Sequence, residues 1–344
     1  MKIDAWWFEN KQRPEEVLQT DWVIPKSHFG VYAETEKITF PLTLCVTAKS
    51  GNLQLYRREF EIHEPKEQTE TYTVECSEYS INLKCTVKEV AGLPGDILVK
   101  IKSQEWEYQE QVTCAYARLH GRITDFDGNP FPAPLLLSRI GFADAPYMGV
   151  WSDRNGEYSV VVPTGCYNAF YVDDNSYGKS TLENWSWHMI VDRDEEHNFK
   201  VGNGEVYSLS VWPNNGGGST LFFWFRPMIL PSIKKEEYEI ELEGSKRQVM
   251  DISPELKAED ITVTLNGKPL PVVSLQKIYE TCPDYTMPSY LVQTERYNGT
   301  PTVGKQTVIV EYDTAKRGGG QSYIARSQGR CQYFYKDSSG LVLQ

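Results

Sequence analysis

The 344-residue sequence has no long hydrophobic run. A membrane-spanning helix needs about 18–20 apolar residues, whereas the longest candidate, LFFWFRPMIL from Leu221, is interrupted by Arg226 and Pro227. The first residues, MKIDAWWFEN, lack an apolar core of signal-peptide length and a small-residue cleavage site. We therefore expect a soluble, cytoplasmic protein with no membrane partner.

Cysteine pairing motifs are also missing. The seven cysteines include no CxxC pair, and an odd number cannot all be paired within one chain. Free thiols in a reducing cytoplasm are therefore the simplest interpretation. The cysteines are Cys45, Cys76, Cys85, Cys114, Cys166, Cys282 and Cys331.

Motifs of nucleophilic and metal catalysis are absent as well. The sequence contains no GxSxG elbow, no HExxH motif and no twelve-residue EF-hand loop. His188 and His197 flank an acidic run at residues 192–196, but their spacing matches no standard ligand set, and a solvated turn explains the run equally well. We predict no metal and no cofactor.

Basic charge is scarce. The chain has 35 Lys and Arg against 47 Asp and Glu, a formal net charge of −12, and no basic cluster. Because nucleic acids and anionic membranes would repel such a chain overall, we predict that neither is a partner.

Alternation of apolar and polar side chains, the period of a half-buried strand, is present nearly everywhere. In ITFPLTLCV, residues 38–46, every second residue is apolar, and a Ser50-Gly51-Asn52 turn then leads into LQLYRREFEI as a hairpin. Similar segments continue to residue 101. The sequence predicts an antiparallel β-sandwich over residues 1–112.

Residues 113–213 combine alternating strands with tight-turn dipeptides. Asp127-Gly128 and Asn155-Gly156 supply the positive φ that tight hairpins need. With ARLHGRITDFDGNPFPAPLLLSRIG and GVWSDRNGEYSVVVPTGCYNAFYVDD, the segment resembles the carboxypeptidase regulatory-like domain, a transthyretin-like β-sandwich. The resemblance implies a fold and a module that is usually non-catalytic. It does not imply carboxypeptidase activity, because no zinc-binding HxxE segment is present.

A run of breakers at residues 213–218, PNNGGG, marks the next predicted boundary. Five strand-like segments follow, and Asn266-Gly267 is a strong hairpin signal between two of them. The sequence therefore predicts a third antiparallel sandwich over residues 214–344, of the Ig-like kind. The predicted fold is all-β, with three consecutive antiparallel β-sandwich domains.

The stretch LENWSWHMIVDRDEEHNFKVGNGEVYSLSVW, residues 182–212, concentrates aromatic, imidazole and carboxylate groups. Strand alternation predicts that Trp185, Trp187, Met189 and Val191 share one apolar face, with His188 on the other. Loops at one end of a sandwich cluster, so distant carboxylates can converge there. The candidate catalytic residues are His188, Asp192, Asp173 and Glu205.

Aromatic residues of the middle segment suggest a binding surface, because flat rings stack on sugar rings and anchor protein interfaces. The candidate ligand-binding residues are Trp151, Tyr171, Tyr177 and Trp212. We favour a non-catalytic protein that binds a carbohydrate or protein partner, for example as an accessory subunit. A β-sandwich enzyme acting on a sugar-like substrate and a structural component of an assembly are the alternatives.

Overall fold

The structure, a computed structural model, describes residues 1–9, 27–87, 92–139, 148–173, 177–213, 220–281, 285–297, 303–318, 322–335 and 341–342. Within these residues the chain forms strands and two short 3₁₀ helices, η1 (Ala258–Asp260) and η2 (Thr314–Arg317). The predicted all-β class is confirmed. No helix in this part of the chain is long and apolar enough to cross a membrane.

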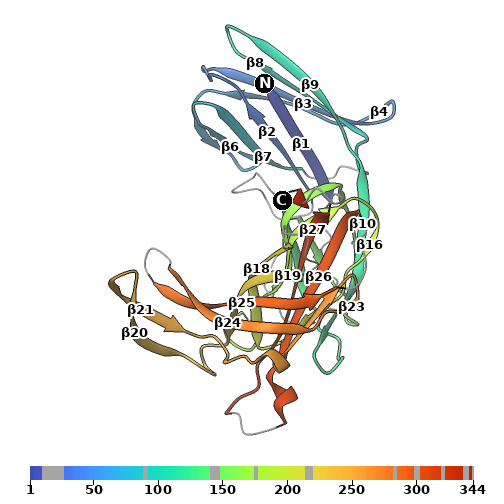
Figure 1. The fold of residues 1–344 in the computed structure, drawn as a ribbon. Helices are drawn as coiled ribbons and strands as arrows, with labels where there is room; N and C mark the ends of the chain where they lie inside the picture. Colours follow the sequence, from blue (N-terminus) through green and yellow to red (C-terminus); the bar gives the residue numbers. More distant parts are fainter. Residues whose placement is uncertain are drawn as a thin grey trace.

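Two sheets formed by β1 to β9 face each other at one end of the molecule (Figure 1). Strand β3 alternates as predicted and buries Leu42, Leu44 and Val46 between the sheets, and Gly51, at φ 56°, turns the chain into β4. One sheet contains β1 (Lys2–Glu9), β2 (Ser27–Glu34), β7 (Ser80–Thr86), β6 (Tyr72–Cys76) and β5 (Lys66–Gln68); the other contains β4 (Leu53–Ile62), β3 (Leu42–Ser50), β8 (Asp96–Lys102) and β9 (Glu107–Thr113).

A four-stranded sheet packs against one part of a nine-stranded sheet and encloses the middle core. Gly156 closes a turn that only glycine fits, because its φ is 75° and an added Cβ would lie 2.2 Å from the Ile123 carbonyl oxygen. The smaller sheet contains β13 (Glu157–Pro163), β10 (Tyr116–Asp125), β16 (Glu195–Glu196) and β17 (Phe199–Val201). The larger contains β12 (Met148–Trp151), β11 (Pro134–Arg139), β14 (Gly165–Val172), β15 (Asn184–Val191), β27 (Arg326–Tyr335), β26 (Gly304–Asp313), β22 (Ile261–Leu265), β23 (Lys268–Pro269) and β28 (Leu341–Val342).

A six-stranded sheet covers the other part of the nine-stranded sheet and completes the third core. Asn266 and Gly267 form the predicted hairpin turn between β22 and β23, both with positive φ. The β20–β21 hairpin projects at the lower left of Figure 1. The sheet contains β18 (Gly204–Pro213), β19 (Thr220–Ile229), β25 (Thr286–Arg296), β21 (Ser245–Asp251), β20 (Glu236–Leu242) and β24 (Val272–Thr281).

Strand pairing crosses the boundary predicted at residue 213. Strand β15 pairs in parallel with β27 through Ser186 opposite Arg330 and Trp187 opposite Cys331, and β18 pairs with β19. Residues 113–213 and 214–344 therefore share one sheet and contribute together to another; residues 214–219 themselves lie outside the described part.

Antiparallel pairing throughout was the other expectation that the structure corrects. The pairs β10–β16, β10–β17, β15–β27 and β21–β25 are parallel. At the first boundary, by contrast, the sheets change between β9, which ends at Thr113, and β10, which begins at Tyr116. Two side chains of β1, Trp6 and Phe8, nevertheless pack into the middle core.

Candidate functional site

His188 breaks the alternation of β15. Its φ is 53°, in the left-handed region that a non-glycine residue seldom adopts. One non-extended residue exchanges the faces of the strand, so Trp187 packs in the third core while Met189 packs in the middle core. The prediction that Trp185, Trp187, Met189 and Val191 share a face is therefore wrong.

The acidic run after β15 forms a structural network with distant strands. The Lys305 ammonium on β26 donates to the Asp192 carboxylate and to the Glu195 carboxylate, both at 2.7 Å. The Gln332 amide on β27 donates to Glu195 at 2.9 Å. These contacts tie the turn to β26 and β27, and Lys305 holds the pKa of Asp192 below its usual value although partial burial opposes it.

His188 does not join the other candidate catalytic residues. It is half-buried, and burial lowers the pKa of its imidazole. Five residues along β15 separate it from Glu183, about 16 Å at the rise of an extended strand. The structure therefore does not bring His188 together with the carboxylates at the other end of the strand.

His197 has a reactive-looking contact that sequence reasoning missed. Its Nε2 atom lies 2.6 Å from the Ser186 hydroxyl oxygen. Both side chains are buried, at 0% and 1% exposure, and burial holds the pKa of His197 well below its usual value. A substrate has no access to this pair, so we assign it to core packing.

Two of the predicted candidates, Asp173 and Glu205, do come together, with Glu183 as a third member. Asp173 follows β14 and Glu183 precedes β15, and the register that pairs Val172 with Asn184 places these two carboxylates opposite each other. They lie two residues beyond the Tyr171–Trp185 pair, on the same face of the hairpin. We call Asp173, Glu183 and Glu205 the carboxyl cluster.

Burial and mutual repulsion shift the pKa values in the carboxyl cluster. Burial, reinforced by Asp173, raises the pKa of Glu183 to about 7. Glu205 is 0% exposed; burial and the negative charge of Glu183 raise its pKa well above the usual range. Burial and the three carboxyl groups together raise the pKa of Tyr177 to about 12. Glu205 is therefore neutral at pH 7.

An aromatic stack borders the carboxyl cluster. Tyr171 and Trp185 stack with ring centroids 4.1 Å apart, and Trp185 stacks on Trp187 at 4.5 Å. Tyr207, on β18, meets both tryptophans edge-on, and the Arg226 guanidinium lies 5.3 Å from the Tyr207 ring centroid. Because Tyr171 and Trp187 cover both faces of Trp185, this stack is a wall and not a platform for a ligand.

The four predicted ligand-binding aromatics fall into two groups. Trp151 and Tyr171 are buried, at 3% and 6% exposure, and pack in the third core. Burial leaves their rings no face on which a ligand could stack. Tyr177 and Trp212 are exposed, at 50% and 38%, so they remain available for contact.

Trp212 belongs to an aromatic row on the outer face of the six-stranded sheet. Its ring stacks on that of its cross-strand partner Phe222, with centroids 6.1 Å apart. Phe223 is fully buried in the third core, so alternation points Phe222 and Trp224 outward, where both are partly exposed. Leu291 of β25, opposite Trp224, extends the row. We call Trp212, Phe222, Trp224 and Leu291 the outer aromatic row.

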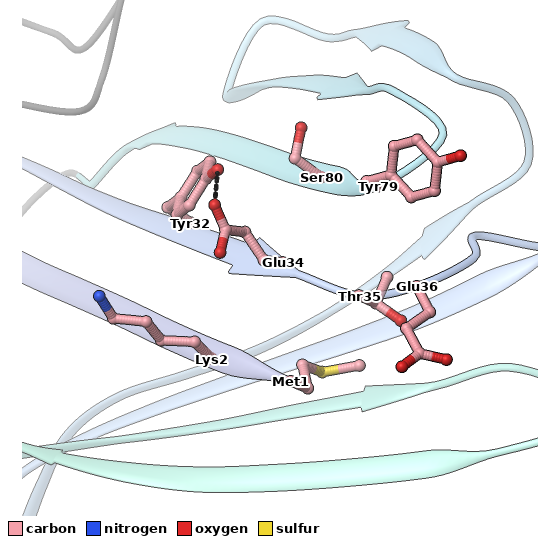
Figure 2. Close-up of a pocket in the computed structure, with 8 residues that line it drawn as sticks. All are labelled: Met1, Lys2, Tyr32, Glu34, Thr35, Glu36, Tyr79 and Ser80. Atoms are coloured by element: carbon pink, nitrogen blue, oxygen red, sulfur yellow. Dashed lines mark hydrogen bonds between the residues drawn. The ribbon is translucent and has the colours of Figure 1, made fainter.

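A shallow pocket of 680 Å³ lies at the edge of the N-terminal sheets (Figure 2). The Tyr32 hydroxyl donates to the Glu34 carboxylate at 2.8 Å, as the dashed line shows. The charged side chains Lys2, Glu34 and Glu36 are exposed, so the pocket offers polar contacts but no buried reactive group. It is lined by Met1, Lys2, Tyr32, Glu34, Thr35, Glu36, Tyr79 and Ser80.

Metal-ligand geometry was examined over the described residues. Among them, no group of three or more His, Cys, Asp or Glu side chains is placed to hold a metal ion. The carboxyl cluster is therefore a group of neighbouring acids and not a preformed set of metal ligands.

No protein-family model matches the chain, and no curated protein matches it. Among solved structures, it aligns with BcpA, the major pilin subunit of Bacillus cereus, at 12% identity over 62% of this chain and 67% of the pilin, with a TM-score of 0.19. A variant of that pilin gives 9% identity, 58% and 70% coverage and 0.19. The complex of Dpr2 Ig1-Ig2 with DIP-Theta Ig1-Ig3 gives 8%, 95%, 98% and 0.16. Likenesses at TM-scores this low carry no argument about fold or function.

Proposed function

We propose that this protein is non-catalytic and binds a carbohydrate or protein partner through the outer aromatic row. The observation that carries the proposal is the exposed, stacked pair of Trp212 and Phe222 on the outer face of a sheet whose inner face is fully packed. An aromatic ring left at the surface costs hydration free energy that contact with a partner recovers.

The surroundings of the row suit either partner class. The polar side chains of Gln293 and Gln276 lie on the neighbouring strands β25 and β24, opposite Phe222 and Leu291 respectively. Amide groups beside flat rings can hydrogen-bond sugar hydroxyls or a polypeptide backbone. The row therefore combines stacking and hydrogen-bonding groups on one surface.

The resemblance of residues 113–213 to the carboxypeptidase regulatory-like domain is part of the proposal. Sandwich packing around the middle core supports it, as do the positive-φ glycines Gly128 and Gly156 in the turns that carry the resemblance. In this proposal the three cores belong to three β-sandwich units, the last of them Ig-like, and the chain acts in the cytoplasm as an accessory subunit.

Substitution of Trp212 tests the function. We expect Trp212→Ala to weaken binding to a glycan array or to a protein captured by the wild-type chain at least tenfold, since central aromatic residues dominate interfaces. Phe334→Ala is the matched control, because Phe334 is 40% exposed against 38% for Trp212 but lies on β27. Equal binding by both variants would remove the row from the function. Loss of self-association alone, measured by sedimentation, would favour the assembly alternative.

An enzyme acting on a sugar-like substrate is the second candidate, and Glu183 favours it. A carboxyl group with a pKa of about 7 beside a second carboxylate, Asp173, is the pairing that acid–base cleavage of a glycosidic bond uses. Hydrolysis of a panel of aryl glycosides, abolished by Glu183→Gln, would establish this reading. Wild-type turnover no faster than that of the variant would exclude Glu183 from catalysis.

A further inference from the structure

The carboxyl cluster differs from the other buried acids of the described chain in having no cation. Asp251 is 2% exposed and is paired with Lys277 at 2.9 Å and Lys234 at 3.3 Å. Asp260, at 0% exposure, is paired with Arg317 at 2.8 Å. The chain therefore supplies a counterion where a carboxylate is buried for stability.

Glu205 has no such partner among the described residues. It is fully buried, and neither of its carboxyl oxygens accepts or donates a hydrogen bond. The indole of Trp185 lies close enough to lower the pKa of Glu205, but its nitrogen also lacks a hydrogen bond of normal geometry. The nearest cation, Arg226, is paired with Glu280 instead. A buried polar group left unsatisfied costs about 1–3 kcal/mol, which a bound ligand would recover.

The solvent side of the cluster is open to a ligand. Asp173 and Glu183 are half-buried and Tyr177 is 50% exposed, whereas the Tyr171–Trp185–Trp187 stack closes the opposite side. A ligand group entering past Tyr177 meets two carboxylates first and the Glu205 carboxyl behind them.

We propose that Asp173, Glu183 and Glu205 bind a primary ammonium group. An ammonium is compact and carries three N–H donors in a tripod, which suits three carboxyl groups from three chain segments. A guanidinium, being planar, suits bidentate contact with a single carboxylate. A metal ion is not the ligand, because the described side chains do not provide converging metal ligands there.

The experiment uses n-propylammonium chloride as the probe, with the full-length protein at pH 8. The readout is the indole N–H resonance of Trp185, assigned by its loss in Trp185→Phe. We expect a saturable shift with a dissociation constant of about 1–10 mM. Tetramethylammonium, which has no N–H donor, and sodium at equal ionic strength should produce no saturable shift, and methylguanidinium should bind more weakly.

Variants separate this site from the outer aromatic row. Glu183→Gln should weaken propylammonium binding at least tenfold, whereas Glu237→Gln, which removes an exposed acid paired with Lys235, should leave it unchanged. Trp212→Ala should also leave it unchanged, so the two proposals can fail separately. A tighter response to acetyl-Gly-Lys-Gly-amide would indicate a protein side chain as the source of the ammonium, and an equal one a free amine.

The proposal is overturned by three results. These are no saturable shift, an equal shift with tetramethylammonium, or undiminished binding by Glu183→Gln. Because glutamine is isosteric with the neutral acid, Glu183→Gln is expected to fold, and its far-ultraviolet circular dichroism checks this.

Discussion

Two buried carboxyl groups on the same six-stranded sheet have opposite surroundings. Asp251 on β21 accepts hydrogen bonds from Tyr238, Ser253 and two lysines, which hold its pKa at about 2 although burial opposes them. Glu205 on β18 has neighbouring acids and no hydrogen bond, and its pKa is raised well above the usual range. The comparison shows that burial alone does not fix ionisation; the partners supplied by the fold do.

Stability and function separate along this comparison. The Asp251 network joins β20, β21 and β24 and satisfies the groups that it buries. The carboxyl cluster leaves repulsion and unsatisfied groups in the native state. Residues that destabilise a fold while facing solvent are typical of binding and catalytic sites.

The largest effect is expected from Asp251→Asn. The variant leaves Lys234 and Lys277 without their buried counter-charge, and we expect the free energy of unfolding at pH 7 to fall by about 3–5 kcal/mol. Because the folded-state pKa of Asp251 lies below its unfolded value, its contribution is present above about pH 4 and is lost as the pH falls toward 2. Urea unfolding at pH 7 measures the change. Glu237→Gln, on the exposed surface, should alter stability by less than about 0.5 kcal/mol.

The opposite sign is expected from Glu183→Gln. The folded-state pKa of about 7 exceeds the usual 4.5, so wild-type stability falls as the pH rises from 4.5 to 7. After allowance for solvent screening of this half-buried group, we expect the variant to be about 2 kcal/mol more stable than wild type at pH 8 and equal to it near pH 4.5. Thermal unfolding across this range measures the difference, and a less stable variant at pH 8 would show that Glu183 has a stabilising partner.

The smallest effect is expected from Glu205→Gln at pH 6. Wild-type Glu205 is already neutral there, and glutamine matches the neutral acid in size, so the free energy of unfolding should change by less than about 1 kcal/mol. Urea unfolding beside Asp251→Asn provides the direct contrast. A loss as large as that of Asp251→Asn would mean that Glu205 is ionised and paired in the folded protein.

Turn chemistry and alternation made much of the local structure predictable. Gly51 and the Asn266-Gly267 dipeptide form the turns expected of them, because positive φ is a property of the residue itself. Strand β3 begins at Leu42, however, and not at the predicted Ile38. The alternating pattern locates a strand more firmly than it locates its ends.

The candidate site was predictable only in part. Asp173 and Glu205 were proposed from the general clustering of loops, and the structure joins them through Glu183, which no motif marked. His188 and Asp192 were grouped with them by proximity in sequence, yet Asp192 pairs with Lys305, 113 residues away. The positive φ of His188, which exchanges the faces of β15, has no signal in the alternating pattern.

The sequence by itself determined the all-β class and several tight turns, since strand periodicity and glycine conformations depend on neighbouring residues. Only the tertiary structure decided that β15 pairs in parallel with β27 and that Glu205 is buried beside Asp173 and Glu183. The physical reason is that any strand edge offers the same backbone donors and acceptors. Which edges meet, and which acids are buried without a cation, depends on packing between segments far apart in the chain.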